Sequence, residues 1–141
     1  MERRAQAQWR GGIRNGEGTL TTDSGTLSGT PYSFTTRFEN GAGTNPEELI
    51  AAAHAGCFSM ALSLILGESG VEPEGIETTA AVTIEREGDG YAIPRIELTV
   101  EVRAPGLDED LFLEAAEQAK TGCPVSKLLN ASISMQARLI G

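Results

Sequence analysis

The longest apolar stretch of the sequence has no polar face. Residues 49–66 carry no formal charge, and apolar or small side chains occupy nearly every position. Thr44 or Asn45 can act as N-cap, Pro46 suits the first helical position, and two glutamates follow where they favour the helix dipole. Gly67 marks the end of the pattern. The pattern predicts a long helix that is apolar on all sides, which is typical of a buried central helix.

The remainder of the chain reads mainly as strands. Thr-rich or alternating segments are separated by glycine-containing turns, and Asp108 begins a second helical pattern that ends at Gly122. The predicted strands are 5–10, 16–22, 33–39, 76–87, 91–103 and 133–139, and a short helix is predicted at 124–129. This order predicts an α+β fold with antiparallel sheets around a long buried central helix. We expect a single domain over residues 1–141.

Composition and charge narrow the function classes. The chain has 141 residues, 40% hydrophobic and 22% charged, which is ordinary for a globular domain. Its net charge of −9 argues against a nucleic-acid partner, since phosphate contacts need clustered Lys and Arg. The arginines near the N-terminus are interleaved with polar and apolar residues, as on a solvated strand, and no apolar segment of a secretory signal follows them. We therefore expect a cytoplasmic protein.

The apolar run could also be mistaken for a membrane span. It is close to the minimum length of about 17 to 20 residues for such a helix. However, it is rich in Ala and also contains Ser, Gly and His, and Glu47, Glu48 and Glu68 flank it instead of the Lys and Arg that fix orientation. We expect no membrane association.

The two cysteines of the chain stand in different local settings. Cys57 lies within the uncharged helix, and Cys123 lies at a loop-to-helix junction before Pro124. A disulfide scaffold needs more cysteines, and a zinc ribbon needs them two residues apart. One buried thiol and one at a helix start suggest a pair that is reduced at rest and reacts in sequence. N-cap donors and the helix dipole would favour the thiolate of Cys123, whereas Cys57 by position alone can be a small core residue.

Two other classes fit the same residues. His54, Cys57 and Cys123 would form a His/Cys/Cys zinc set with one open position. Against this, the second half of the deaminase zinc signature and its glutamate are missing, and a lone histidine on an apolar helix is more often hydrogen-bonded core. A thiol redox sensor would use the cysteine pair to change partners. Sustained turnover with peroxide and a dithiol distinguishes an enzyme from a sensor.

Two separated motifs resemble one known family. The string TNPEELIAAAHAGC ends at Cys57, and GCPVS spans residues 122–126. Together they resemble the osmotically inducible protein C (OsmC) and organic hydroperoxide resistance family of thiol peroxidases. The resemblance covers nearly the whole chain and includes the dipeptide Gln8-Trp9 and the glycine-rich N-terminal hairpin. The string FTTRFE at residues 34–39 resembles the osmotically inducible branch.

The resemblance implies an α+β intertwined homodimer that reduces organic hydroperoxides and hydrogen peroxide, in stress defence, without metal or prosthetic group. It implies that Cys57 is the peroxidatic cysteine and Cys123 the resolving cysteine. It also implies that Arg37 holds the first thiol as thiolate and that Glu47 orients Arg37. An external dithiol, at family level a dihydrolipoyl group on a carrier protein, reduces the disulfide. We assign first attack to Cys57 because an arginine in a dry pocket can outweigh a helix end. Phe34, Phe38 and Phe58 could line a pocket for an alkyl group, or they could be ordinary core residues.

Helix geometry adds an expectation about assembly. Glu47 and Cys57 are ten positions apart, so they are separated by about 15 Å along one helix. Glu47 is therefore expected to serve the Cys57 of a partner chain, in a homodimer with shared active sites. A stripe of small residues would allow two such helices to approach closely: Ala52, Gly56, Ser59 and Ser63.

Overall fold

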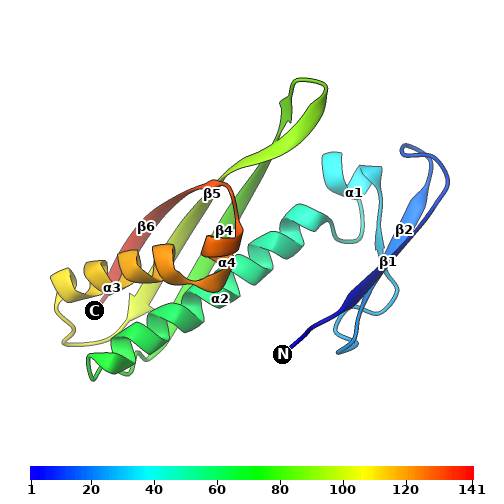
Figure 1. Ribbon diagram of the computed structural model, residues 1–141. Coiled ribbons are helices and arrows are strands. Elements are labelled where there is room, and N and C mark those ends of the chain that lie inside the picture. Colours follow the sequence, from blue (N-terminus) through cyan, green and yellow to red (C-terminus); the bar gives the residue numbers. More distant parts are fainter. The chain divides into compact units, whose positions relative to one another are not determined.

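The computed structural model describes all of residues 1–141, which form two compact units, Met1–Leu49 and Ile50–Gly141 (Figure 1). The first unit contains a three-stranded antiparallel sheet in the order β1-β2-β3. Its strands are β1 (Ala5–Arg10), β2 (Glu17–Thr22) and β3 (Thr30–Tyr32). The ring of Tyr32 packs against Trp9, and a Cβ at Gly18 would lie 2.5 Å from it, so only glycine fits there. The predicted N-terminal hairpin is confirmed.

The predicted strand at 33–39 is wrong, because a short helix, α1 (Phe34–Phe38), occupies this segment. Ser33 and Thr36 form a capping box: the backbone N–H of Thr36 donates to Ser33 Oγ, and that of Ser33 donates to Thr36 Oγ1. These bonds satisfy amides that the start of a helix leaves free. They outweigh the strand preference of the Phe and Thr residues, which is weak without a partner strand.

The long helix α2 (Pro46–Glu68) begins and ends where the sequence predicts. The backbone N–H of Glu48 donates to Asn45 Oδ1 over 2.8 Å, which identifies Asn45 as the N-cap. At the other end, Val71 N–H donates back to the carbonyl of Leu66, and Gly70 adopts a φ of 80°. This left-handed turn ends the helix at low cost because glycine has no Cβ.

The second unit places helices against a three-stranded sheet in the order β4-β5-β6. Its elements are β4 (Gly75–Glu87), β5 (Gly90–Arg103), α3 (Glu109–Gly122), α4 (Pro124–Leu128) and β6 (Ser132–Ile140). Each was predicted within a residue or two. The expectation of purely antiparallel sheets is corrected, since β6 runs parallel to β5. The crossover through α3 and α4 returns the chain to the same end of the sheet, and this permits the parallel pairing.

The hydrophobic core of this unit joins α2, β5 and α3, which lie together in Figure 1. From β5 it takes the inward face of the predicted alternation, Ile96, Leu98, Val100 and Val102. Its other large members are Phe58, Leu62 and Leu66 from α2 and Phe112 from α3. By length and composition α2 could cross a membrane, but these contacts identify it as a core helix.

The other side of α2 is uncovered in a single chain. Met60 is 77% exposed and Leu64 is 65% exposed, although both are large apolar residues. The small residues Ala52, Gly56 and Ser63 are exposed as well, and a Cβ on Gly56 would meet no atom within 4 Å. Ser59 departs from this stripe, because its hydroxyl lies 2.7 Å from that of Thr78 in β4. One face of α2 therefore remains available for close packing by a partner.

Candidate functional site

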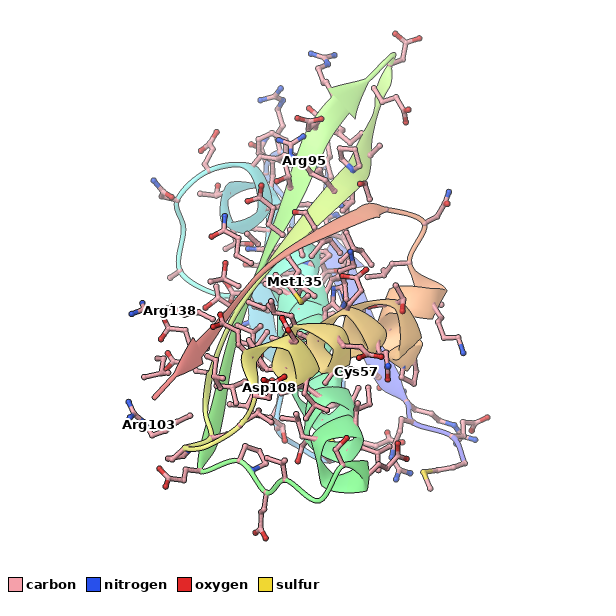
Figure 2. All side chains as sticks on the ribbon, turned by 90° about the vertical axis from the view of Figure 1, so that its left-hand side faces the viewer. Cys57, Arg95, Arg103, Asp108, Met135 and Arg138 are labelled. Carbon is pink, nitrogen blue, oxygen red and sulfur yellow. The ribbon has the colours of Figure 1, made fainter.

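The two thiols of the chain are brought together in the second unit. Cys57 and Cys123 are both free, and their side chains are within hydrogen-bonding contact. Cys57 lies on α2, where Figure 2 labels it, and its side chain is partly exposed. Cys123 is fully buried. We expected Cys57 to be the buried thiol, so the structure reverses that expectation. The reason is tertiary: the second unit covers the α3–α4 junction completely but leaves one side of α2 open.

Cys123 is held by two helix ends at once. Its backbone N–H donates to the carbonyl of Ala119 at the end of α3, and its sulfur accepts from the backbone N–H of Ser126 over 3.3 Å. Pro124 occupies the first helical position of α4. The predicted N-cap position of Cys123 is confirmed, and the resolving candidate has little freedom to move without unwinding α4.

The surroundings of Cys57 in this unit do not favour its thiolate. Burial raises the pKa of the Cys57 thiol, and the neighbouring Cys123 raises it further, while a hydrogen bond with the backbone of Val125 lowers it in part. Desolvation is the largest of these effects because a charged sulfur loses more from leaving water than a neutral thiol does. A reactive Cys57 therefore needs a positive charge from elsewhere.

A chain of hydrogen bonds leads away from the thiols to a buried histidine. His54 Nε2 lies 2.7 Å from Ser126 Oγ, and this oxygen lies 3.1 Å from Cys123 Sγ. His54 is fully buried and its Nδ1 has no hydrogen-bond partner. Burial lowers the pKa of His54, so its imidazole is neutral near pH 7. Sequence reasoning missed Ser126, although its place three residues after an N-cap cysteine was a usable signal.

The first unit contains the predicted arginine and glutamate as an ion pair. Arg37 Nε and Nη2 donate to the same Glu47 oxygen, Oε1, over 3.0 and 2.8 Å. The Glu47 side chain is only 8% exposed, whereas that of Arg37 is 40% exposed. Glu47 Oε2 is buried without a partner. The Glu47 carboxylate can therefore hold the Arg37 guanidinium in place while the guanidinium stays partly exposed.

An apolar pocket surrounds this arginine within the first unit. Its volume is about 270 Å³, and its walls include Trp9, Ile13, Tyr32, Phe34, Arg37 and Phe38. The guanidinium of Arg37 lies 5.4 Å from the ring centre of Phe38. Two of the three phenylalanines expected at an alkyl pocket, Phe34 and Phe38, thus line it. The third, Phe58, is fully buried in the core of the second unit, which is the other alternative that the sequence left open for it.

The structure does not bring together the ligands that the zinc alternative requires. No group of three His, Cys, Asp or Glu side chains has the spacing to hold a metal ion. His54 Nε2 is within hydrogen-bond distance of Ser126 Oγ instead. The histidine is hydrogen-bonded core, as the lone position on an apolar helix suggested.

Comparison with known proteins identifies the family. Residues 39–138 match the family model described as OsmC-like protein. The chain is 51% identical over 139 residues to the peroxiredoxin OsmC of Escherichia coli K12, covering 99% of this chain and 97% of that protein. The chain belongs to the OsmC-like family. The predicted family, α+β fold class and thiol-peroxidase type are thereby confirmed.

Solved structures agree with this assignment. The crystal structure of the organic hydroperoxide resistance protein OhrB of Bacillus subtilis superposes with a TM-score of 0.67 at 29% identity, covering 97% of this chain and 98% of that one. An OsmC-like protein from Mycoplasma pneumoniae gives a TM-score of 0.77 over 100% of this chain and 99% of that one. At 15% identity, the latter supports the fold alone.

Proposed function

We propose that this OsmC-like protein is a thiol peroxidase that reduces organic hydroperoxides, and hydrogen peroxide, in defence against oxidative stress. The observation that carries the proposal is the contact between a partly exposed thiol, Cys57, and a buried one, Cys123. The names of two relatives, a peroxiredoxin and an organic hydroperoxide resistance protein, support the same activity.

Cys57 is the peroxidatic cysteine in this proposal because peroxide can reach it. Its thiolate attacks the terminal peroxide oxygen, the O–O bond breaks, and the alkoxide leaves as alcohol after taking a proton. Cys57 is then a sulfenic acid. Cys123 attacks the sulfenic sulfur and displaces hydroxide, which leaves as water, and a disulfide remains. An external dithiol reduces this disulfide by thiol–disulfide exchange and is itself oxidised.

Arg37 and Glu47 complete the proposed site. The pKa of Cys57 is raised by its own unit, so a nearby guanidinium would restore the thiolate near neutral pH. Arg37 would also stabilise the charge on the departing oxygen. Glu47 holds this guanidinium by two hydrogen bonds to one oxygen, as its proposed orienting role requires. The pocket beside Arg37 is apolar enough for the alkyl group of an organic hydroperoxide.

We further propose that the protein is a homodimer with shared active sites. A core helix with a large uncovered apolar face is poorly stable in water alone. The small residues on this face would allow the α2 helices of two chains to approach closely. Glu47 and Cys57 are about 15 Å apart along α2 by helix rise, which favours an arrangement in which Glu47 acts at the Cys57 of the partner chain. We place the protein in the cytoplasm, as a soluble protein, where a dihydrolipoyl carrier protein is the proposed reductant.

Two single substitutions test the proposed cycle. Cys57→Ser should abolish peroxide consumption, including the first turnover. Cys123→Ser should consume about one equivalent of alkyl hydroperoxide per subunit and stop at a sulfenic acid that a dimedone-type probe labels. Steady turnover of Cys123→Ser with an ordinary dithiol would contradict the resolving role. If the unmodified protein forms the disulfide with peroxide but does not turn over with any dithiol, the redox sensor replaces the enzyme.

A further inference from the structure

The cycle described above uses Cys123 but gives no role to the buried hydrogen bonds that link it through Ser126 to His54. Its two links measure 2.7 Å and 3.1 Å, within hydrogen-bond distance for oxygen–nitrogen and sulfur–oxygen pairs. All three side chains are buried, with His54 and Cys123 fully so. A buried polar network is costly unless its members are satisfied, so its presence beside a reactive pair requires an explanation.

Disulfide formation needs a proton acceptor at this place. Cys123 reacts as a thiolate, yet its sulfur is enclosed and water cannot readily take the proton. The backbone N–H of Ser126 can stabilise the thiolate but cannot remove a proton. The Ser126 hydroxyl is the side-chain group in hydrogen-bond contact with the sulfur that can both accept and donate a proton.

We propose that His54 is a positioning residue that withdraws the Cys123 proton through the Ser126 hydroxyl during disulfide formation. This inference rests on the proposed function. The Cys123 S–H proton moves to Ser126 Oγ while the Ser126 proton moves to His54 Nε2. The thiolate so formed attacks the sulfenic sulfur of Cys57 and its hydroxide leaves. His54 then releases its proton, which neutralises the hydroxide, so that the net products are one disulfide and one water.

The environment of His54 suits a transient acceptor. Burial lowers its pKa and no charged group contributes to that shift, so the ring is neutral at rest. The relay uses the tautomer with its proton on Nδ1, in which Nε2 accepts a hydrogen bond from the Ser126 hydroxyl. The titratable groups of the network besides His54 are the two thiols, Cys57 from α2 and Cys123 from the α3–α4 junction. Nδ1 has no partner, so an imidazolium would be poorly stabilised and would release its proton quickly.

The decisive experiment follows the decay of the sulfenic acid after one equivalent of organic hydroperoxide. Rapid quenching with a dimedone-type probe and mass spectrometry gives this rate in the full-length protein between pH 6 and 8. His54→Gln keeps a hydrogen-bonding group near Ser126 but cannot take up a proton. The decay should slow about 100-fold, within the range of general acid–base effects, while sulfenic acid still forms on Cys57. It should also become roughly tenfold faster per pH unit, because direct ionisation of a thiol then limits it.

The controls separate this role from a structural one. Ser126→Ala removes the hydroxyl but keeps the backbone donor, so it should slow decay like His54→Gln, and it decides the question if that variant does not fold. Ser59→Ala removes a hydroxyl contact of α2 elsewhere, with Thr78, and should decay like the parent.

The possible failures are distinguishable. Decay at the parent rate in His54→Gln, or in Ser126→Ala, overturns the relay. Failure of folded His54→Gln to form sulfenic acid also overturns it, since the histidine would then act on the first step. If the parent protein itself forms no sulfenic acid with peroxide, the proposed function fails instead.

Discussion

Glu47→Gln tests the orienting role of the ion pair with little change of shape. The substitution keeps the length of the side chain and one acceptor oxygen but removes the charge that two donors of Arg37 share. At 2.8 Å two unit charges attract by about 6 kcal/mol at an effective dielectric constant of about 20. Because Arg37 is 40% exposed, water screens much of this attraction, and exposed pairs contribute only about 0 to 1 kcal/mol. We therefore expect the ion pair between Arg37 and Glu47 to contribute about 1 to 2 kcal/mol, between these two limits.

This free energy has a kinetic consequence if it holds Arg37 in its working orientation. About 1.4 kcal/mol corresponds to a factor of ten, so the second-order rate of Cys57 oxidation should fall about tenfold at pH 7. The free energy of unfolding should fall by about 1 to 2 kcal/mol, as the same pair is lost. Stopped-flow oxidation by an alkyl hydroperoxide and urea unfolding measure the two quantities on one preparation.

Glu48→Gln is the matched control. Glu48 occupies the same first turn of α2, so it has nearly the same interaction with the helix dipole. Its side chain is exposed and contacts Thr44 at 3.4 Å, away from Arg37. This variant should react with peroxide at the parent rate. Equal rates for Glu47→Gln and Glu48→Gln would refute the orienting role of Glu47.

Two further predictions concern the arginine and the assembly. Arg37→Met should slow peroxide reduction strongly near pH 7 and recover in part as pH rises, because without the guanidinium the already raised pKa of Cys57 leaves little thiolate at neutral pH. A pH–rate profile that overlays the parent would remove Arg37 from the site. Co-refolding slowed Glu47→Ala with inactive Cys57→Ser should raise the activity above the average of the two variants, since a heterodimer with shared sites contains one intact set. Heterodimers that form but show only that average would place each site within one chain.

Local chemistry explains why so many elements could be predicted from the sequence. Asn45 and Asp108 cap their helices through their own side chains, and Pro124 starts α4, so these boundaries depend on a few neighbouring residues. The alternation along β5 likewise shows its buried face directly, because successive strand residues point to opposite sides. Strand propensity predicts a strand at 33–39, but the capping box of Ser33 and Thr36 starts a helix there.

The candidate site shows the same difference between what neighbouring residues specify and what only the packed chain specifies. The family motifs marked Cys57, Cys123, Arg37 and Glu47 in the sequence, and the N-cap position of Cys123 was readable from its neighbours. Which thiol is covered was not, because burial depends on how α3 and α4 pack against α2. The link from His54 to Ser126 joins residues 72 positions apart, and no local pattern indicates it. Similarly, the parallel pairing of β5 with β6 follows from the crossover path and not from either strand.

The sequence by itself therefore determined the helix ends, the turns and most strands, because short-range hydrogen bonds and side-chain alternation specify them, and its family motifs nominated the candidate site residues. Only the tertiary structure decided that Cys57 is the open thiol and Cys123 the enclosed one, and that a neutral histidine lies behind Ser126. The physical reason is that exposure, desolvation and long-range hydrogen bonds are properties of the packed chain, and they arise only when distant segments exclude water from the same space.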